Sequence, residues 1–171
     1  MSIRERGLSP PVSVSKALAS LGSYAANDVL SESTATGTSW AFTGISRGVA
    51  TGGYIVKAMI RADTTGKVFR PTMFLFDAPP AGGQLNDNAL NIEVSATDAA
   101  KYIGKIDWVA TETLNSGYSE SIATPSTIGN LAMSFQCAND SDDLFGVLVS
   151  RNAIALGTGG TVTVSLTVER L

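Results

Sequence analysis

Histidine is absent from the 171-residue chain, and cysteine occurs once, as Cys137. Without histidine the chain lacks the commonest general base and the commonest zinc ligand, and it cannot form a Ser-His-Asp or Cys-His catalytic group by itself. A single cysteine excludes an intrachain disulfide and a cysteine-based metal cluster. We therefore expect no catalytic residues, no metal site and no cofactor.

Charge is also scarce. Charged residues make up 16% of the chain, and 12 basic against 15 acidic side chains give a formal net charge of -3, whereas a typical domain carries ~25% charged residues. Lys and Arg are scattered, so we do not expect nucleic acid as a partner. No apolar run reaches the ~18 residues of a membrane span, and MSIRERGLSPP at the start lacks the apolar core of a signal peptide. We expect a soluble protein that does not enter a membrane.

The chain is rich in strand patterns. Its last residues, TVTVSLTVERL, alternate apolar and hydroxyl side chains, which is typical of a half-buried β-strand. The residues expected on the buried face are Val162, Val164, Leu166 and Val168. In GYIVKAMIRA, the same alternation predicts a shared face made of Tyr54, Val56, Ala58 and Ile60.

About eight such segments, separated by Gly-rich and Asx-rich breakers, predict an all-β sandwich or barrel. The other segments are VSVSKAL, SWAFTGI, VFRPTMFLF, KIDWVATETL, NLAMSFQC and LFGVLVSR. One short helix is expected in SATDAAKYIG, with Ser95 or Thr97 as its N-cap and Gly104 as its end. The Pro10-Pro11 pair separates an N-terminal arm, residues 1–11, from a single domain of residues 12–171.

One oxygen-rich stretch, FLFDAPPAGGQLNDNALNI at residues 74–92, is a candidate cation site or active site. A calcium loop needs oxygen ligands at alternate positions, then Gly and a distal Glu. Asn86, Asp87 and Asn88 are instead consecutive, and no Gly follows at the required place. We predict a long loop that leaves a buried strand and whose Asx side chains bond loop backbone groups.

Other candidates for chemistry have plainer interpretations. The acidic stretch ANDSDDLF, residues 138–145, is predicted to be a solvated hairpin turn rather than a calcium loop. Trp40 and Trp108 are expected in the core, although together with Tyr118 they are the stacking candidates if the protein binds glycans. Cys137 lies in an apolar segment and is predicted to be an inert buried thiol. The absence of histidine does not exclude a hydrolase that uses two carboxylates, but no motif supports such a mechanism.

Five segments together resemble a family of small structural proteins encoded by tailed bacteriophages. They are SKALASLGSYAANDVLSES, GGYIVKAMIRA, MFLFDAPPAGGQLNDNALNI, YIGKIDWVA and LFGVLVSRNAIALGTGGTVTVSLTVERL. They span the chain from about Ser15 to Leu171 and carry strand-and-turn patterns rather than catalytic signatures. The resemblance implies a capsid decoration (cement) protein with a jelly-roll-like antiparallel β-sandwich.

The resemblance also implies partners and a location. The partners would be the phage major capsid protein and further copies of the chain, as a dimer or trimer, on the outer surface of a capsid assembled in the host cytoplasm. The residues we select from the sequence as candidate partner contacts are Arg4, Arg6, Leu8, Pro10, Pro11, Asp87 and Asn88. Arginine suits bidentate pairing with acidic capsid residues. The alternative hypothesis is a phage tail, fibre or host-attachment module that binds glycans.

Overall fold

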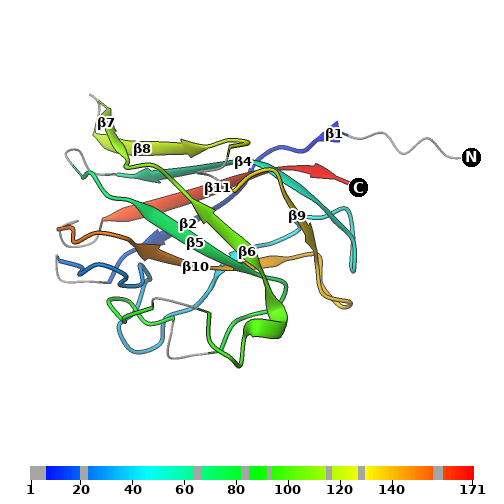
Figure 1. The fold of residues 1–171 in the computed structure, drawn as a ribbon, viewed down its shortest axis with the longest axis horizontal. Helices are drawn as coiled ribbons and strands as arrows, with labels where there is room; N and C mark the ends of the chain where they lie inside the picture. Colours follow the sequence, from blue (N-terminus) through cyan, green and yellow to red (C-terminus); the bar gives the residue numbers. More distant parts are fainter. Residues whose placement is uncertain are drawn as a thin grey trace, which may run out of the picture.

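The structure is a computed structural model that describes residues 7–19, 23–63, 67–81, 85–91, 94–114, 117–126, 130–155 and 160–171. Its elements are β1 (Gly7–Leu8), β2 (Val12–Ala17), β3 (Trp40–Phe42), β4 (Gly52–Ala62), β5 (Pro71–Phe76), η1 (Ala99–Lys101), β6 (Tyr102–Asp107), β7 (Glu112–Leu114), β8 (Tyr118–Ala123), β9 (Met133–Gln136), β10 (Leu144–Ser150) and β11 (Thr161–Arg170). The strands form two antiparallel sheets in a sandwich (Figure 1).

The strand order is that of a jelly roll. The larger sheet contains the order β2-β11-β4-β8, and the smaller sheet has the order β3-β10-β5-β6. The strands pair from the outside inward, β2 with β11, β3 with β10, β4 with β8 and β5 with β6, so the chain forms one long antiparallel ribbon. Rolling this ribbon brings β11 beside β4 and β10 beside β5. The predicted jelly-roll-like sandwich is confirmed, but the sequence segments missed β1 and β8, and the expected strand in KIDWVATETL is divided into β6 and β7.

The main core lies between the two sheets. The predicted buried face of β11 is confirmed, because Val162, Val164, Leu166 and Val168 are all buried. A smaller apolar cluster lies on the outer face of the smaller sheet, and its buried members are Val29, Phe74, Phe76, Leu85, Val147 and Val149. Strands β5 and β10 are therefore covered on both faces, which explains why their sequences are nearly continuous apolar runs.

The predicted buried face of β4 is wrong in the first half of the strand. Ala58 and Ile60 are buried as expected, but Tyr54 is exposed and Ile55 is buried in its place. The pairing of β4 with β11 shifts register and skips Val56. An extra residue of this kind, a β-bulge, reverses the in-and-out alternation beyond it. The alternation read from the sequence is therefore valid only on one side of the bulge.

The predicted short helix, of one to two turns at most, is present as a single turn, but its ends differ from those expected. A single 3-10 turn, η1, spans Ala99–Lys101, and its N-cap is Asp98 rather than Ser95 or Thr97. The chain then continues directly into β6, so Gly104 lies inside a strand and ends no helix. Pairing of β6 with β5 outweighs the local helix preference of these residues. Nowhere in the described ranges does a helix have the length and apolar character needed to cross a membrane.

Candidate functional site

The predicted N-terminal contacts are described only in part. Arg4 and Arg6 lie outside the described residues. Leu8 is 71% exposed, and Pro10 and Pro11 are also exposed. The described part of the arm therefore offers one large apolar side chain and two proline rings to solvent.

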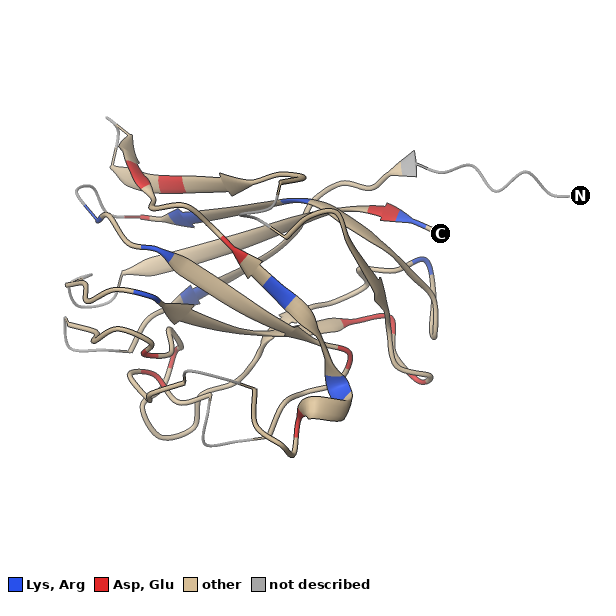
Figure 2. Ribbon diagram, viewed as in Figure 1, with Lys and Arg blue, Asp and Glu red and all other residues tan. Residues whose placement is uncertain are grey.

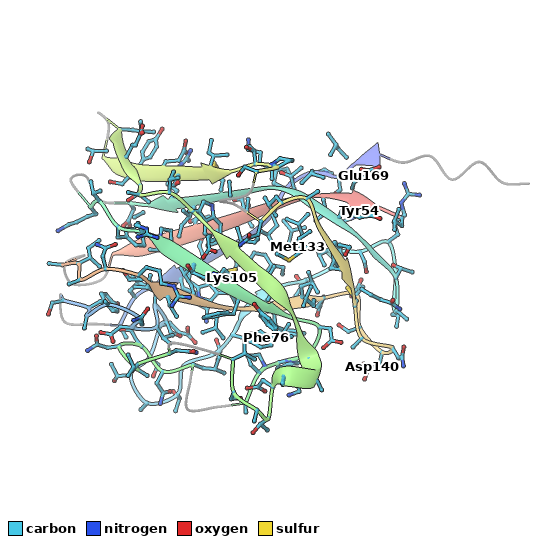
Figure 3. All side chains as sticks on the ribbon, in the orientation of Figure 1. Tyr54, Phe76, Lys105, Met133, Asp140 and Glu169 are labelled. Carbon is cyan, nitrogen blue, oxygen red and sulfur yellow. The ribbon has the colours of Figure 1, made fainter. Side chains whose placement is uncertain are left out.

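The arm does not project freely at Leu8, because β1 pairs with the end of β11. Leu8 lies opposite Glu169, and Glu169 in turn lies opposite Tyr54 of β4. Directly opposite residues of antiparallel strands project to the same face, so these three side chains share the outer face of the larger sheet. Figure 3 shows Tyr54 and Glu169 side by side at this end of the sheet.

Hydroxyl side chains dominate the outer face of the larger sheet along β2 and β11. The Ser13 and Ser165 hydroxyl oxygens lie 2.7 Å apart. The Ser15 and Thr163 hydroxyl oxygens are separated by the same 2.7 Å. These hydrogen bonds between strands satisfy the hydroxyl groups mutually, so the face is polar but carries little charge along these two strands (Figure 2).

Asp87 and Asn86 tie their loop to another loop. The Tyr24 hydroxyl lies 3.1 Å from each carboxylate oxygen of Asp87, and the Ser31 backbone N–H donates to Asp87 Oδ1 at 2.7 Å. Asn86 Oδ1 accepts from the Gly37 backbone N–H at 3.0 Å. These Asx side chains do bond backbone N–H groups, but the N–H groups belong to Ser31 and Gly37, far away in the sequence, and not to the loop's own turns as predicted.

The two candidate contacts in this loop differ in their exposure. Asp87 is 3% exposed, so its carboxylate faces the interior. Asn88 is exposed and has a φ of 63°, a left-handed conformation that asparagine tolerates better than most residues. Of these two side chains, that of Asn88 is the one presented to solvent.

The acidic stretch after Cys137 is not the predicted hairpin turn. β9 belongs to the larger sheet and β10 to the smaller one, so residues 138–143 cross from one sheet to the other. Asp143 Oδ1 accepts from the Gly44 backbone N–H at 2.8 Å, which fixes the crossing to the turn after β3. A short Asx-rich segment between two strands usually indicates a hairpin, but here each strand has its partner elsewhere. Within the described ranges, no group of three or more His, Cys, Asp or Glu side chains is placed to hold a metal ion.

The tryptophans and the cysteine are core residues, as predicted. Trp40 and Trp108 are 1% and 2% exposed, and their indole N–H groups donate to the carbonyl oxygens of Leu30 and Ala58. Buried rings of this kind cannot stack on a sugar. Cys137 is buried, and burial raises the pKa of its thiol.

Tyr118, the third candidate for sugar stacking, is covered by an arginine. The guanidinium carbon of Arg61 lies 4.4 Å from the centroid of the Tyr118 ring. Arg61 also pairs with Glu120 at 2.8 Å. One face of the Tyr118 ring is therefore occupied by a cation from the neighbouring strand.

A pocket that sequence reasoning missed lies on the outer face of the smaller sheet. It has a volume of about 710 Å³ and is lined by Arg70, Pro71, Thr72, Lys105, Asp107, Trp108, Val109, Ala110 and Arg151. Figure 2 shows the corresponding charged segments at the start of β5, along β6 and at the end of β10. These segments are distant in the sequence, and only antiparallel pairing of the three strands brings them together.

A chain of hydrogen bonds organises the floor of this pocket. Arg151 Nε donates to the Thr72 hydroxyl at 3.0 Å, and that hydroxyl donates to Asp107 Oδ1 at 2.6 Å. Asp107 Oδ2 lies 2.8 Å from Lys105 Nζ and accepts from Asn130 Nδ2 at 3.0 Å. Burial by itself would raise the pKa of Asp107, but hydrogen bonds from Lys105 and Thr72 bring it below its ordinary value. The carboxylate is therefore ionised and its two oxygens are occupied.

Among the described residues, the edge formed by β1 and the pocket around Arg151 are both candidates for binding. A comparison with protein-family models gives no match, and a comparison with curated proteins gives no significant match.

Proposed function

We propose that the protein is a bacteriophage capsid decoration protein that binds the outside of the major capsid protein lattice and stabilises the head. Support comes from the strand-and-turn segments that resemble the family of phage structural proteins. Further support comes from the jelly-roll sandwich, whose larger sheet presents exposed side chains from β2 and β4.

The observation that carries the proposal is the exposed Leu8 on a paired strand. Tyr54 and Leu171, which are 36% and 39% exposed, lie at the same end of the larger sheet. Exposed apolar side chains that cluster are typical of contact surfaces. Backbone pairing with β11 holds β1 in one conformation before a partner binds. The entropic cost of ordering this strand is therefore not added to the cost of association.

The mechanism of stabilisation is mass action. A protein that binds the assembled lattice, but not dissociated subunits, lowers the free energy of the lattice by its own binding free energy. A dimer or trimer placed on a capsid symmetry axis would engage several capsid subunits at once, and this multivalency raises the effective affinity.

The first prediction tests this edge with a matched pair of variants. Leu8→Asp places a charge where an apolar contact is proposed, and Leu90→Asp does the same at another leucine, 66% exposed, on a different part of the surface. We expect Leu8→Asp to lower the affinity for empty capsids of the encoding phage at least ~10-fold, which corresponds to about 1.4 kcal/mol, and Leu90→Asp to bind normally. Because the two side chains are exposed, we expect the free energy of unfolding of each variant to lie within about 0.5 kcal/mol of the wild-type value.

The measurement is co-sedimentation with capsids, together with the melting temperature of the capsids. Deletion of residues 1–11 should give the same loss of occupancy. Unchanged occupancy for both Leu8→Asp and the deletion would contradict the proposed edge. Binding of the wild type to purified tails or to glycans, and not to heads, would instead support the host-attachment alternative.

A further inference from the structure

The pocket around Arg151 concentrates positive charge in a chain that is negative overall. Arg70, Lys105 and Arg151 line it together with one carboxylate, that of Asp107. Three cations and one anion leave a local charge of +2, against a formal charge of -3 for the whole chain. A partly enclosed pocket with an excess of one sign of charge attracts ions of the opposite sign.

The two arginines approach each other because of strand pairing. Ser150 of β10 lies opposite Pro71 of β5, and the Arg151 backbone N–H donates to the Arg70 carbonyl at 2.7 Å. The next pair along the two strands is therefore Arg151 and Arg70, whose side chains project to the same outer face. Burial lowers the pKa of Arg151, and the neighbouring charge of Arg70 lowers it further, against the opposing effect of Asp107.

The Arg151 guanidinium is held in place before any ligand binds. Its Nε bonds to Thr72 and its Nη1 donates to Asn27 Oδ1 at 2.8 Å. The guanidinium carbon lies 5.2 Å from the centroid of the Phe74 ring. Among the described residues, neither Arg151 Nη2 nor the guanidinium of Arg70 makes a hydrogen bond. The pocket therefore presents unused donors from two arginines, at least one of them fixed.

The rest of the pocket wall is apolar. Val109 is 52% exposed and lines the pocket beside Ala110. A volume of about 710 Å³ is within the range of small-molecule sites. Guanidinium donors bind carboxylate and phosphate oxygens in a fork geometry, and the apolar wall suits a compact hydrophobic group.

We propose that this pocket binds a small organic oxyanion, with its carboxylate or phosphate group on Arg70 and Arg151 and its apolar part against Val109. Lys105 contributes to the attractive field but remains paired with Asp107. The binding site lies on the smaller sheet and the proposed capsid-binding edge lies on the larger one. Ligand binding is therefore a separate property from decoration, and each can fail without the other.

The test is a titration of the full-length protein followed by amide NMR shifts at low salt. The probes are phenyl phosphate, benzoate, inorganic phosphate and neutral benzyl alcohol. We expect saturable shifts at the amides of Arg70, Thr72 and residues 105–110 and 150–152, with a Kd of about 1–10 mM for phenyl phosphate and benzoate. Inorganic phosphate should bind several-fold more weakly, and benzyl alcohol should not bind.

Variants separate the roles of the charges. Arg70→Gln should lower the affinity for phenyl phosphate about 10-fold. Asp107→Asn should raise that affinity several-fold, because the competing carboxylate is removed. Lys57→Gln, which removes an exposed cation on the larger sheet, should leave the Kd unchanged. An absence of saturable shifts at about 50 mM phenyl phosphate, equal binding of benzyl alcohol, or no effect of Arg70→Gln would each overturn the proposal.

Discussion

At the scale of single residues, the least expected feature is Lys16, a buried lysine on the core-facing side of β2. The Lys16 side chain is 8% exposed and pairs with Glu32, whose side chain is 32% exposed. Lys16 also donates to the Thr38 carbonyl and lies 5.6 Å from the centroid of the Trp40 ring. Burial lowers the pKa of Lys16, and its bond with Glu32 offsets this only in part. The pair therefore orders the loop after β2 more than it adds to net stability.

Glu32 gives the first residue-scale prediction, on acid stability. Burial alone would raise the pKa of Glu32, but hydrogen bonds from Lys16, Thr38 and Ser31 together lower it from 4.5 to about 2. Because the folded-state pKa is depressed, the stabilisation is present above about pH 5 and is lost as the pH falls towards 2. We expect this loss to be about 1–2 kcal/mol after allowance for solvent screening of a side chain one-third exposed.

The measurement is the free energy of unfolding in urea between pH 7 and pH 2. Glu32→Gln should be less stable at neutral pH and should show a smaller decrease on acidification than the wild type. Glu112→Gln, which alters an exposed carboxylate on β7, is the control and should follow the wild-type curve. Parallel curves for Glu32→Gln and the wild type would contradict the prediction.

Asp87 gives the second residue-scale prediction. Removal of its buried carboxylate leaves the Tyr24 hydroxyl and the Ser31 N–H without this acceptor. We expect Asp87→Ala to lower the free energy of unfolding by about 2–3 kcal/mol, whereas the exposed neighbour Asn88→Gly should change it by less than about 0.5 kcal/mol. If Asp87→Ala keeps full stability and loses capsid occupancy, Asp87 acts in partner binding rather than in the fold.

At the scale of elements, β4 decides how the larger sheet is assembled. It pairs with β11 along one edge and with β8 and β9 along the other. Its first residues approach both neighbours so closely that a side chain does not fit. An added Cβ at Gly53 would lie 2.3 Å from the Glu169 carbonyl oxygen of β11. The glycines at the start of β4 thus permit the backbone contacts that hold the end of β11 next to β1.

The corresponding prediction compares two glycines. Gly53→Ala should cost about 1–3 kcal/mol, because the new methyl group forces the backbones of β4 and β11 apart. Gly48→Ala should be neutral within about 0.5 kcal/mol, since a Cβ there meets nothing within 4 Å. Chemical denaturation of the two variants measures the difference, and equal stability would show that the sheet end relaxes without cost.

At the scale of the whole molecule, the fold depends on contacts between the two ends of the chain. β11 pairs with β1, β2 and β4, so the last strand lies inside the larger sheet rather than at its edge. Leu166 pairs with Val12, and Thr161 with Ala17. A long ribbon closed in this way cannot complete its core until β11 is in place.

This topology gives the last prediction. Removal of residues 161–171 should abolish the cooperative thermal transition and the near-ultraviolet circular dichroism signal, because the core loses four buried side chains of β11 and the sheet loses a central strand. Deletion of residues 1–11 removes only the short β1 pairing and should leave the transition cooperative. A truncated protein that still unfolds cooperatively would show that the remaining strands form a self-sufficient core.

The sequence by itself determined the all-β class, the positions of most strands, the buried face of β11 and the core location of Trp40, Trp108 and Cys137. Periodicity and composition are local properties of the chain, and these features depend on them. That Asx side chains of the loop after β5 bond backbone groups was predictable from the residue types, but their partners, Ser31 and Gly37 of another loop, were not.

The tertiary structure alone decided the bulge that turns Tyr54 outward, the end of the helix at β6, the crossing after Cys137 and the pocket between Arg70 and Arg151. Each of these depends on which strands become neighbours. Pairing partners in a rolled ribbon lie up to the length of the chain apart, so no local pattern specifies them. Burial and register, once set by those partners, then fix which side chains reach solvent and can meet another molecule.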